Sequence, residues 1–242
     1  MKEESLNRWT EEASQTFLDY GRYYVPARET QLNLISRLIP PKDEAFEVIE
    51  LACGEGLLAE AILQRHPTAT VHGYDGSPAM LQRAQTRLRT FNGRFLTHKF
   101  DLFDYHWRQV NHFVHAVVSS LALHHLDGEQ KQTLFHDVHN MLHPGGVFIV
   151  ADLVQPVGAL ATAVAAQAWD EAVKQRALAL DGNTNAYEKF AQTEWNLFTY
   201  PDPMDKPSPI FEQLKWLEAA GFTAVDVYWM QAGHTIYGGQ KS

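Results

Sequence analysis

The sequence contains one cysteine, Cys53, among 242 residues. A single cysteine excludes an internal disulfide, a cysteine-rich zinc site and a cysteine-ligated iron–sulfur cluster. Long hydrophobic runs are also missing: no window approaches the uninterrupted apolar stretch of about 18 residues that suggests a membrane span. The N-terminal residues lack the apolar segment of a secretory signal. We therefore predict a cytoplasmic protein that is not embedded in a membrane.

Positive charge is scarce relative to negative charge, since 20 Lys+Arg and 29 Asp+Glu give a formal net charge of -9. This balance argues against binding nucleic acid through a broad basic surface, and we expect a small-molecule ligand instead. The hydrophobic fraction of 45% is ordinary for a packed core and excludes wholesale disorder. The length suits one α/β domain with a lid. We expect the protein to be a monomer or a homodimer.

Apolar runs typical of buried strands alternate with helical periodicity through the middle of the chain. This alternation predicts a parallel sheet whose strands are joined by right-handed crossovers. Near the C-terminus, two strand-like runs are separated by a short loop containing glycine, which predicts an antiparallel hairpin. The expected strands cover residues 46–51, 69–74, 93–100, 114–119, 147–151, 223–229 and 234–238, and the expected helices cover 57–64, 78–89, 130–142 and 211–220.

Two segments interrupt this alternation. Residues 1–40 and 153–210 have helical patterns and many aromatic side chains, and the second segment ends in a proline-rich loop. We predict that both form helical lids on one domain that spans residues 1–242. Closure of such lids would exclude water and shape an apolar pocket.

A turn that contains glycine, Glu50-Leu51-Ala52-Cys53-Gly54-Glu55-Gly56, follows the first expected strand. Its glycines let the backbone turn tightly and approach a ligand closely. The next strand ends in Asp75, at the separation where an acidic residue binds a ribose diol in open α/β folds. Residues 54–59 also fit the dinucleotide fingerprint G-x-G-x-x-A, so an NAD(P)-dependent oxidoreductase is an alternative.

Three features favour a ligand other than a dinucleotide. Glu50 places a carboxylate beside the glycines, which suits a cationic ligand better than a pyrophosphate. Asp101 ends the third strand, where its carboxylate can reach the amino group of an adenine. The chain ends in the expected hairpin rather than in a separate catalytic domain.

The sequence resembles the class I S-adenosylmethionine-dependent methyltransferases in segments that follow the family's order: VIELACGEG at 48–56, GYDGSPAML at 73–81, SSLALHHL at 119–126, LHPGGVFIVAD at 142–152 and LEAAGF at 217–222. The resemblance implies an α/β fold with a Rossmann-like, doubly wound, seven-stranded sheet, mostly parallel with a C-terminal antiparallel hairpin. It also implies methyl transfer from S-adenosylmethionine, giving S-adenosylhomocysteine, to a small-molecule acceptor at O, N or C. A cofactor-binding partner protein without catalytic activity fits the same motifs.

The resemblance also assigns cofactor contacts to residues at the carboxyl ends of the strands. Glu50, Ala52, Gly54 and Gly56 would surround the methionine part, Asp75 would hold the ribose, Gly76 and Met80 would flank the adenine, Asp101 and Leu102 would meet its edge, and Ser119 or Ser120 would approach the methionine moiety. From the N-terminal lid, we expect Arg28 to pair with the cofactor carboxylate and the ring of Tyr20 to contact the cofactor.

Methyl transfer from a sulfonium needs a general base only where the nucleophile must lose a proton. His124 and His125, just past the fourth strand, are the candidate catalytic residues, and the alternative is that one of them only packs beside the cofactor. Aromatic side chains of the lids are the candidates for substrate contact: Tyr23, Trp169, Trp195 and Tyr200.

The spacing of His136, His139 and His143 suggests that they share a helix face. No nearby pattern of carboxylates completes a set of metal ligands. We therefore expect no metal site.

Overall fold

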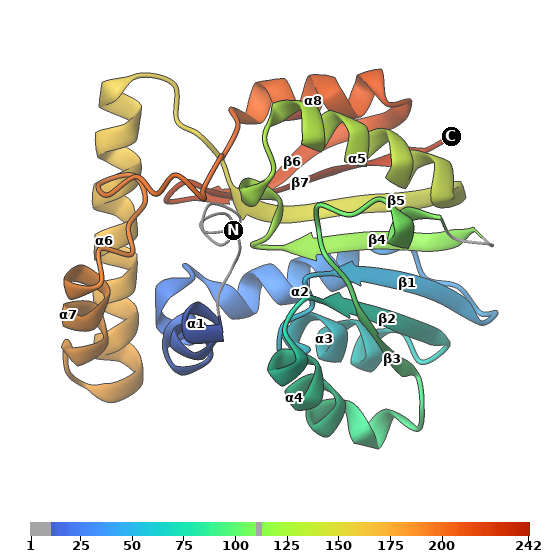
Figure 1. Ribbon diagram of the computed structural model, residues 1–242, viewed down its shortest axis with the longest axis horizontal. Helices are drawn as coiled ribbons and strands as arrows, with labels where there is room; N and C mark the ends of the chain where they lie inside the picture. Colours follow the sequence, from blue (N-terminus) through green and yellow to red (C-terminus); the bar gives the residue numbers. More distant parts are fainter. Residues whose placement is uncertain (1–10, 110–112) are drawn as a thin grey trace, which may run out of the picture.

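A computed structural model describes residues 11–109 and 113–242, and its centre is a seven-stranded sheet with the strand order β3-β2-β1-β4-β5-β7-β6 (Figure 1). The first ten residues of the predicted N-terminal lid lie outside the described residues. The expected seven-stranded, mostly parallel sheet is confirmed. Its strands are β1 (Phe46–Leu51), β2 (Ala69–Asp75), β3 (Phe95–Lys99), β4 (Val114–Ser120), β5 (Leu142–Leu153), β6 (Phe222–Gln231) and β7 (His234–Lys241).

Strands β1 to β5 are parallel, so the ends of β1, β2 and β4 meet at one edge of the sheet. Leu51, at the end of β1, pairs with Tyr74 on one side and with Ser119 on the other. Strand β7 pairs antiparallel with both β5 and β6, which confirms the predicted hairpin. Ala232 and Gly233 form its two-residue turn with φ of 51 and 74, and positive φ at both positions matches the twist of the flanking strands.

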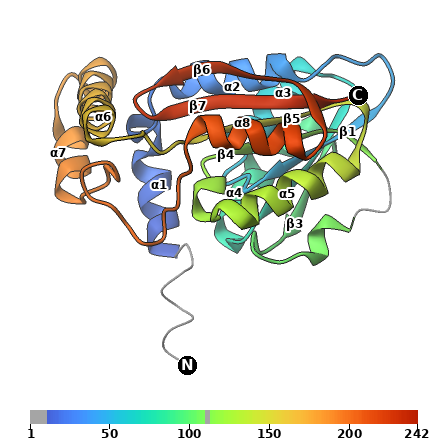
Figure 2. The same ribbon diagram turned by 90° about the horizontal axis from the view of Figure 1, so that it is seen from above.

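Helices cover both faces of the sheet (Figures 1 and 2). Because side chains alternate along a strand, Val48 of β1 packs into one hydrophobic core and Ile49 into the other. Ile35 is fully buried in the first core, so the C-terminal part of the predicted N-terminal lid also covers the sheet. Helices α2 (Arg28–Leu38), α3 (Leu57–Arg65) and α4 (Pro78–Leu88) cover the first face, and α5 (Gly128–Met141) and α8 (Ile210–Ala219) cover the second.

Three further helices, α1 (Glu11–Tyr24), α6 (Ala159–Asp181) and α7 (Asn185–Gln192), lie beyond the carboxyl ends of the parallel strands (Figure 1). They share a third core that joins the two segments predicted as lids. The indole of Trp169 donates a hydrogen bond of 2.7 Å to the carbonyl of Tyr24, and the hydroxyl of Tyr23 donates one of 2.7 Å to Asp181. Within the described part of the chain, none of the helices has the length and apolar character needed to cross a membrane.

The boundary between α5 and β5 differs from the expected one. Helix α5 ends at Met141, and Leu142 already pairs with Val114 in the sheet. Pro144 disfavours a helical conformation in the residue before it, which explains why the helix stops early. His143 therefore lies in β5, and the prediction that it shares a helix face with His136 and His139 is wrong.

The centre of β7 has no room for a side chain at Gly238. A Cβ atom there would lie 2.1 Å from the carbonyl oxygen of Phe148 on β5. We expect Gly238→Ala to lower the free energy of unfolding by roughly 3 kcal/mol, because the strands must separate to admit the methyl group. Urea denaturation of this variant and of Gly128→Ala, whose Cβ would meet only the ring edge of Trp216 at 3.2 Å, checks the prediction. Equal midpoints for the two variants would contradict it.

Candidate functional site

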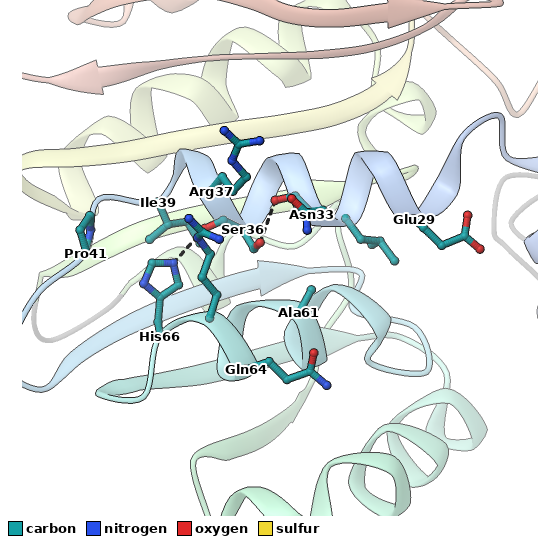
Figure 3. Close-up of a pocket in the computed structure, with 11 residues that line it drawn as sticks. Glu29, Asn33, Ser36, Arg37, Ile39, Pro41, Ala61, Gln64 and His66 are labelled. Carbon is teal, nitrogen blue, oxygen red and sulfur yellow. Dashed lines mark hydrogen bonds between the residues drawn. The ribbon is translucent and has the colours of Figure 1, made fainter.

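A cavity of about 600 Å³ opens at the carboxyl ends of β1, β2 and β4. Figure 3 shows a second hollow, of about 670 Å³, between α2 and α3, where Arg37, Gln64 and His66 are among the lining residues. None of the predicted site residues lines that second hollow, so the first cavity is the candidate site. The predicted residues that line the candidate cavity are Arg28, Glu50, Ala52, Gly54, Asp75, Gly76, Met80, Asp101, Leu102, Ser120 and His125.

The turn after β1 takes its shape from left-handed backbone conformations. Ala52, Gly54 and Gly56 have φ of 54, 53 and 83. A Cβ atom added at Gly54 would meet no other atom within 4 Å, and Gly54 lines the cavity, so the backbone is open to a ligand there. At Gly56 a Cβ would lie 2.9 Å from Leu88, so this glycine allows the turn to pack on α4 and does not itself line the cavity.

Asp75 holds this turn against the end of β2. Its Oδ2 atom accepts a hydrogen bond of 2.8 Å from the backbone N–H of Gly54, and its Oδ1 atom accepts one of 2.8 Å from the N–H of Ser77. Ser77 in turn caps α4 by accepting from the N–H of Met80 at 3.2 Å. Asp75 also lines the cavity, so its carboxylate lies where a ligand hydroxyl could approach it.

Glu50 and Arg28 bring an acidic and a basic side chain to the same cavity. Glu50 is 2% exposed, and its Oε2 atom has no hydrogen-bond partner among the described residues. Burial raises the pKa of Glu50 to about 8, against the opposing effect of Arg28. Arg28 donates a hydrogen bond of 2.6 Å to the hydroxyl of Ser120, and burial lowers the pKa of Arg28 to about 10. A buried carboxylate oxygen with spare hydrogen-bonding capacity favours a ligand that brings a cationic donor.

Acidic and apolar groups close the far end of the cavity. Asp101 accepts a hydrogen bond of 3.0 Å from the N–H of Phe103, which fixes its carboxylate at the end of β3. Gly76, Met80 and Leu102 line the same cavity. The arrangement can accommodate a flat ring system with an amino group at its edge.

A cluster of histidines and carboxylates lies at the opposite end, where His125 lines the cavity. His124 is buried, and its Nδ1 atom lies 2.5 Å from Oδ1 of Asp152. Burial lowers the pKa of His124, but Asp152 outweighs this effect, so the pKa is raised overall. Asp205 Oδ1 lies 3.1 Å from Nδ1 of His125 and 3.6 Å from Nε2 of His124. Asp205 comes from the proline-rich loop of the second lid segment, and it is not among the residues predicted from the sequence.

The other predicted residues lie away from the cavity walls. Ser119 is fully buried and donates to the carbonyl of Leu51, while Tyr20 stacks on Tyr24 at a ring distance of 5.6 Å. None of the four predicted substrate contacts lines the cavity: Tyr23, Trp169 and Trp195 belong to the third core, and Tyr200 is exposed. Lining residues that the sequence analysis did not assign to the site are Phe17, Cys53, Glu55, Leu57, Ser77, Lys99, Phe100, Phe103, Asp104, Leu121, Ala122 and Met204.

Comparison with known protein families gives a match to a family model described as a methyltransferase domain, over residues 48–146. Trans-aconitate 2-methyltransferase from Variovorax paradoxus is 31% identical over 159 residues, which cover 64% of this chain and 57% of the relative. The alignment therefore spans just over half the length of that relative.

Solved structures share the fold at lower identity. An O-methyltransferase family protein from Burkholderia thailandensis superposes with a TM-score of 0.66 at 19% identity, over 99% of this chain and 63% of that chain. Phosphoethanolamine N-methyltransferase 2 from Haemonchus contortus, in complex with S-adenosyl-L-methionine, gives a TM-score of 0.61 at 15% identity, over 94% and 45% of the two chains. Residues 48–146 therefore match a methyltransferase domain that includes the turn after β1 beside the cavity, and the chain shares the fold of these solved methyltransferases.

Proposed function

We propose that the protein transfers a methyl group from S-adenosylmethionine to a small-molecule acceptor. The observation that carries this proposal is the buried carboxylate of Glu50, a residue that lines the cavity and whose Oε2 atom has no hydrogen-bond partner among the described residues. S-adenosylmethionine carries a sulfonium and an ammonium group, and either cation would compensate this carboxylate. A dinucleotide would instead place a pyrophosphate in the same turn, where it could not compensate an ionised Glu50 and would be repelled by it.

The remaining groups fit the rest of the cofactor. Asp75 would accept the ribose hydroxyls, as acidic residues at this position of open α/β folds do. Arg28 would pair with the carboxylate of the methionine part, and Asp101 would accept from the adenine amino group. Support for this arrangement comes from the elements that carry these cavity residues: Arg28 begins α2, Glu50 lies near the end of β1, Asp75 ends β2 and Asp101 follows β3.

For methyl transfer, the protein mainly has to hold the acceptor and the cofactor in the correct relative position. The nucleophile attacks the methyl carbon in line with the carbon–sulfur bond, whose electron pair stays on sulfur as S-adenosylhomocysteine forms. Holding the two reactants together can contribute roughly 7–11 kcal/mol. A cavity of about 600 Å³ must hold the cofactor and the acceptor together, which favours a compact acceptor.

Isothermal titration of the full chain with S-adenosylhomocysteine and with NADH tests the proposal. We expect saturable binding of S-adenosylhomocysteine and none of NADH. Native mass spectrometry of the freshly purified protein would identify any cofactor or acceptor that it retains. No S-adenosylhomocysteine binding at millimolar concentration would contradict the proposal, and saturable NADH binding would favour the oxidoreductase alternative. Tight cofactor binding without turnover on a broad acceptor panel would favour the non-catalytic alternative.

A further inference from the structure

Three side chains of types that can coordinate a metal ion, those of His124, His125 and Asp205, meet beside the cavity. Asp205 Oδ1 lies 3.1 Å from His125 Nδ1 and 3.6 Å from His124 Nε2. One ligand atom from each residue lies within 4.8 Å of the other two. At metal–ligand distances of about 2.1 Å, neighbouring ligands are roughly 3.0 Å apart in octahedral geometry and roughly 3.4 Å apart in tetrahedral geometry. The two separations from Asp205 are already close to these values, and the two histidine ligand atoms lie within 4.8 Å of each other.

Asp152 holds His124 in the orientation that coordination requires. Its carboxylate accepts from Nδ1 of His124 at 2.5 Å, from the backbone N–H of His124 at 2.9 Å and from that of Leu153 at 2.8 Å. A proton on Nδ1 leaves the Nε2 lone pair on the side of Asp205. A lone pair and a carboxylate oxygen 3.6 Å apart favour a cation between them. A buried carboxylate behind an imidazole is also the arrangement that orients histidines in metal sites.

The loop that carries Asp205 is fastened next to the two histidines. The backbone N–H of Lys206 donates a hydrogen bond of 2.5 Å to the carbonyl of His124, and Nζ of Lys131 donates one of 2.6 Å to the carbonyl of Lys206. Lys131 is a buried cation whose charge acts on His124, and the carboxylates of Asp152 and Asp205 oppose that charge. The ligand geometry is therefore set by the fold, not by a free loop.

We propose that His124, His125 and Asp205 bind one divalent transition-metal ion such as Zn²⁺ at the edge of the cavity. Imidazole ligands with one carboxylate suit Zn²⁺ or Fe²⁺, whereas Mg²⁺ and Ca²⁺ prefer oxygen ligands. Three protein ligands leave a coordination position open, as in catalytic metal sites. His125 lines the cavity together with Met204, so an acceptor can reach the ion from there.

The consequence for the acceptor rests on the proposed function. The ion would bind an oxygen of the acceptor and lower its pKa, so that the proton leaves to solvent. The oxygen lone pair then forms the bond to the methyl carbon as the carbon–sulfur bond breaks. The acceptor is accordingly an alcohol, phenol or acid methylated at oxygen, and His124 and His125 act as ligands where the sequence analysis proposed a base.

Metal binding by the full chain is the direct test. After treatment with EDTA, the protein should bind one equivalent of Zn²⁺ by isothermal titration, and Co²⁺ should give visible absorption bands of a site with nitrogen ligands. Asp205→Asn and His125→Gln should each lower the Zn²⁺ affinity by about 100-fold or more, and Asp152→Asn by about 10–100-fold. His136→Gln, an exposed histidine of α5, is the matched control and should leave the affinity unchanged.

Titration of the metal-free protein with S-adenosylhomocysteine separates this inference from the proposed function. S-adenosylhomocysteine binding without Zn²⁺ binding would overturn the metal site alone. Equal Zn²⁺ affinities in the wild type, Asp205→Asn and His125→Gln would also overturn it. Stoichiometric Zn²⁺ binding that both variants weaken, without any S-adenosylhomocysteine binding, would support the metal site and contradict the proposed function.

Discussion

Replacing Asp75 by alanine should lower the affinity for S-adenosylhomocysteine by about 100-fold. Hydrogen bonds to a charged group contribute roughly 1.5–3 kcal/mol, and about 1.4 kcal/mol corresponds to a factor of ten. The Asp75 carboxylate accepts from the N–H groups of Gly54 and Ser77, which fixes its position beside the cavity. The variant loses the proposed ribose contacts. It also loses the two hydrogen bonds through which Asp75 joins the turn after β1 to the start of α4. Isothermal titration of both proteins measures the change.

Asp104→Ala is the matched control for this prediction. Asp104 also lines the cavity, and its carboxylate also accepts from a backbone N–H, that of His106 at 3.0 Å. Because no cofactor contact is assigned to Asp104, its removal should change the affinity little. Circular dichroism and thermal unfolding show whether each variant is folded. If folded Asp75→Ala protein binds S-adenosylhomocysteine as tightly as Asp104→Ala does, Asp75 does not bind the ribose.

The sequence predicts the wall of the cavity that lies at the ends of β1, β2 and β3, because the signals for this wall are local. The glycines of the turn directly follow a buried strand, and Asp75 and Asp101 each stand at or just after the end of a strand. In a parallel sheet such positions meet at one edge, so reading strand ends along the chain is enough to bring these side chains together. The same reasoning predicts the seven strands and the C-terminal hairpin.

The opposite side of the site, which is formed by α1 and by the loop between α7 and α8, cannot be predicted from strand ends. Its residues come from segments far apart in the sequence. Phe17 comes from α1, whereas Met204 and Asp205 come from an irregular loop between α7 and α8. No periodicity indicates where such a loop docks; the hydrogen bond from Lys206 to the carbonyl of His124 is visible only in the folded chain.

The aromatic residues of the lids illustrate a different ambiguity. A tryptophan on a helix has the same pattern whether it packs against another helix or binds a ligand. Trp169 is buried between α1 and α7, where its indole donates to Tyr24. Substrate contact by Trp169 and the other three aromatics stays a prediction, since none of them lines the cavity in this structure.

Glu50→Gln should stabilise the protein at alkaline pH and weaken cofactor binding at the same time. Burial raises the pKa of Glu50 to about 8 in the folded state, above its ordinary value of 4.5. The folded protein therefore holds this proton more tightly than the unfolded chain, so stability falls as the pH rises from about 4.5 to about 8. Glutamine cannot ionise. The gain in melting temperature over wild type should be near zero at pH 5 and largest near pH 9.

Ligand binding should lower the pKa of Glu50 again, because a cationic ligand beside Glu50 favours the ionised carboxylate. The wild-type protein should then release a proton when it binds S-adenosylhomocysteine near pH 7, and Glu50→Gln should not. Titrations in buffers of different ionisation enthalpy measure that proton. The variant should also bind about 10–100-fold more weakly, since it loses a charged hydrogen bond. Glu55→Gln is the control, because Glu55 lines the same cavity but pairs with Arg87 at 2.8 Å. Equal proton release by Glu50→Gln and the wild type would show that another group carries the charge that selects the ligand.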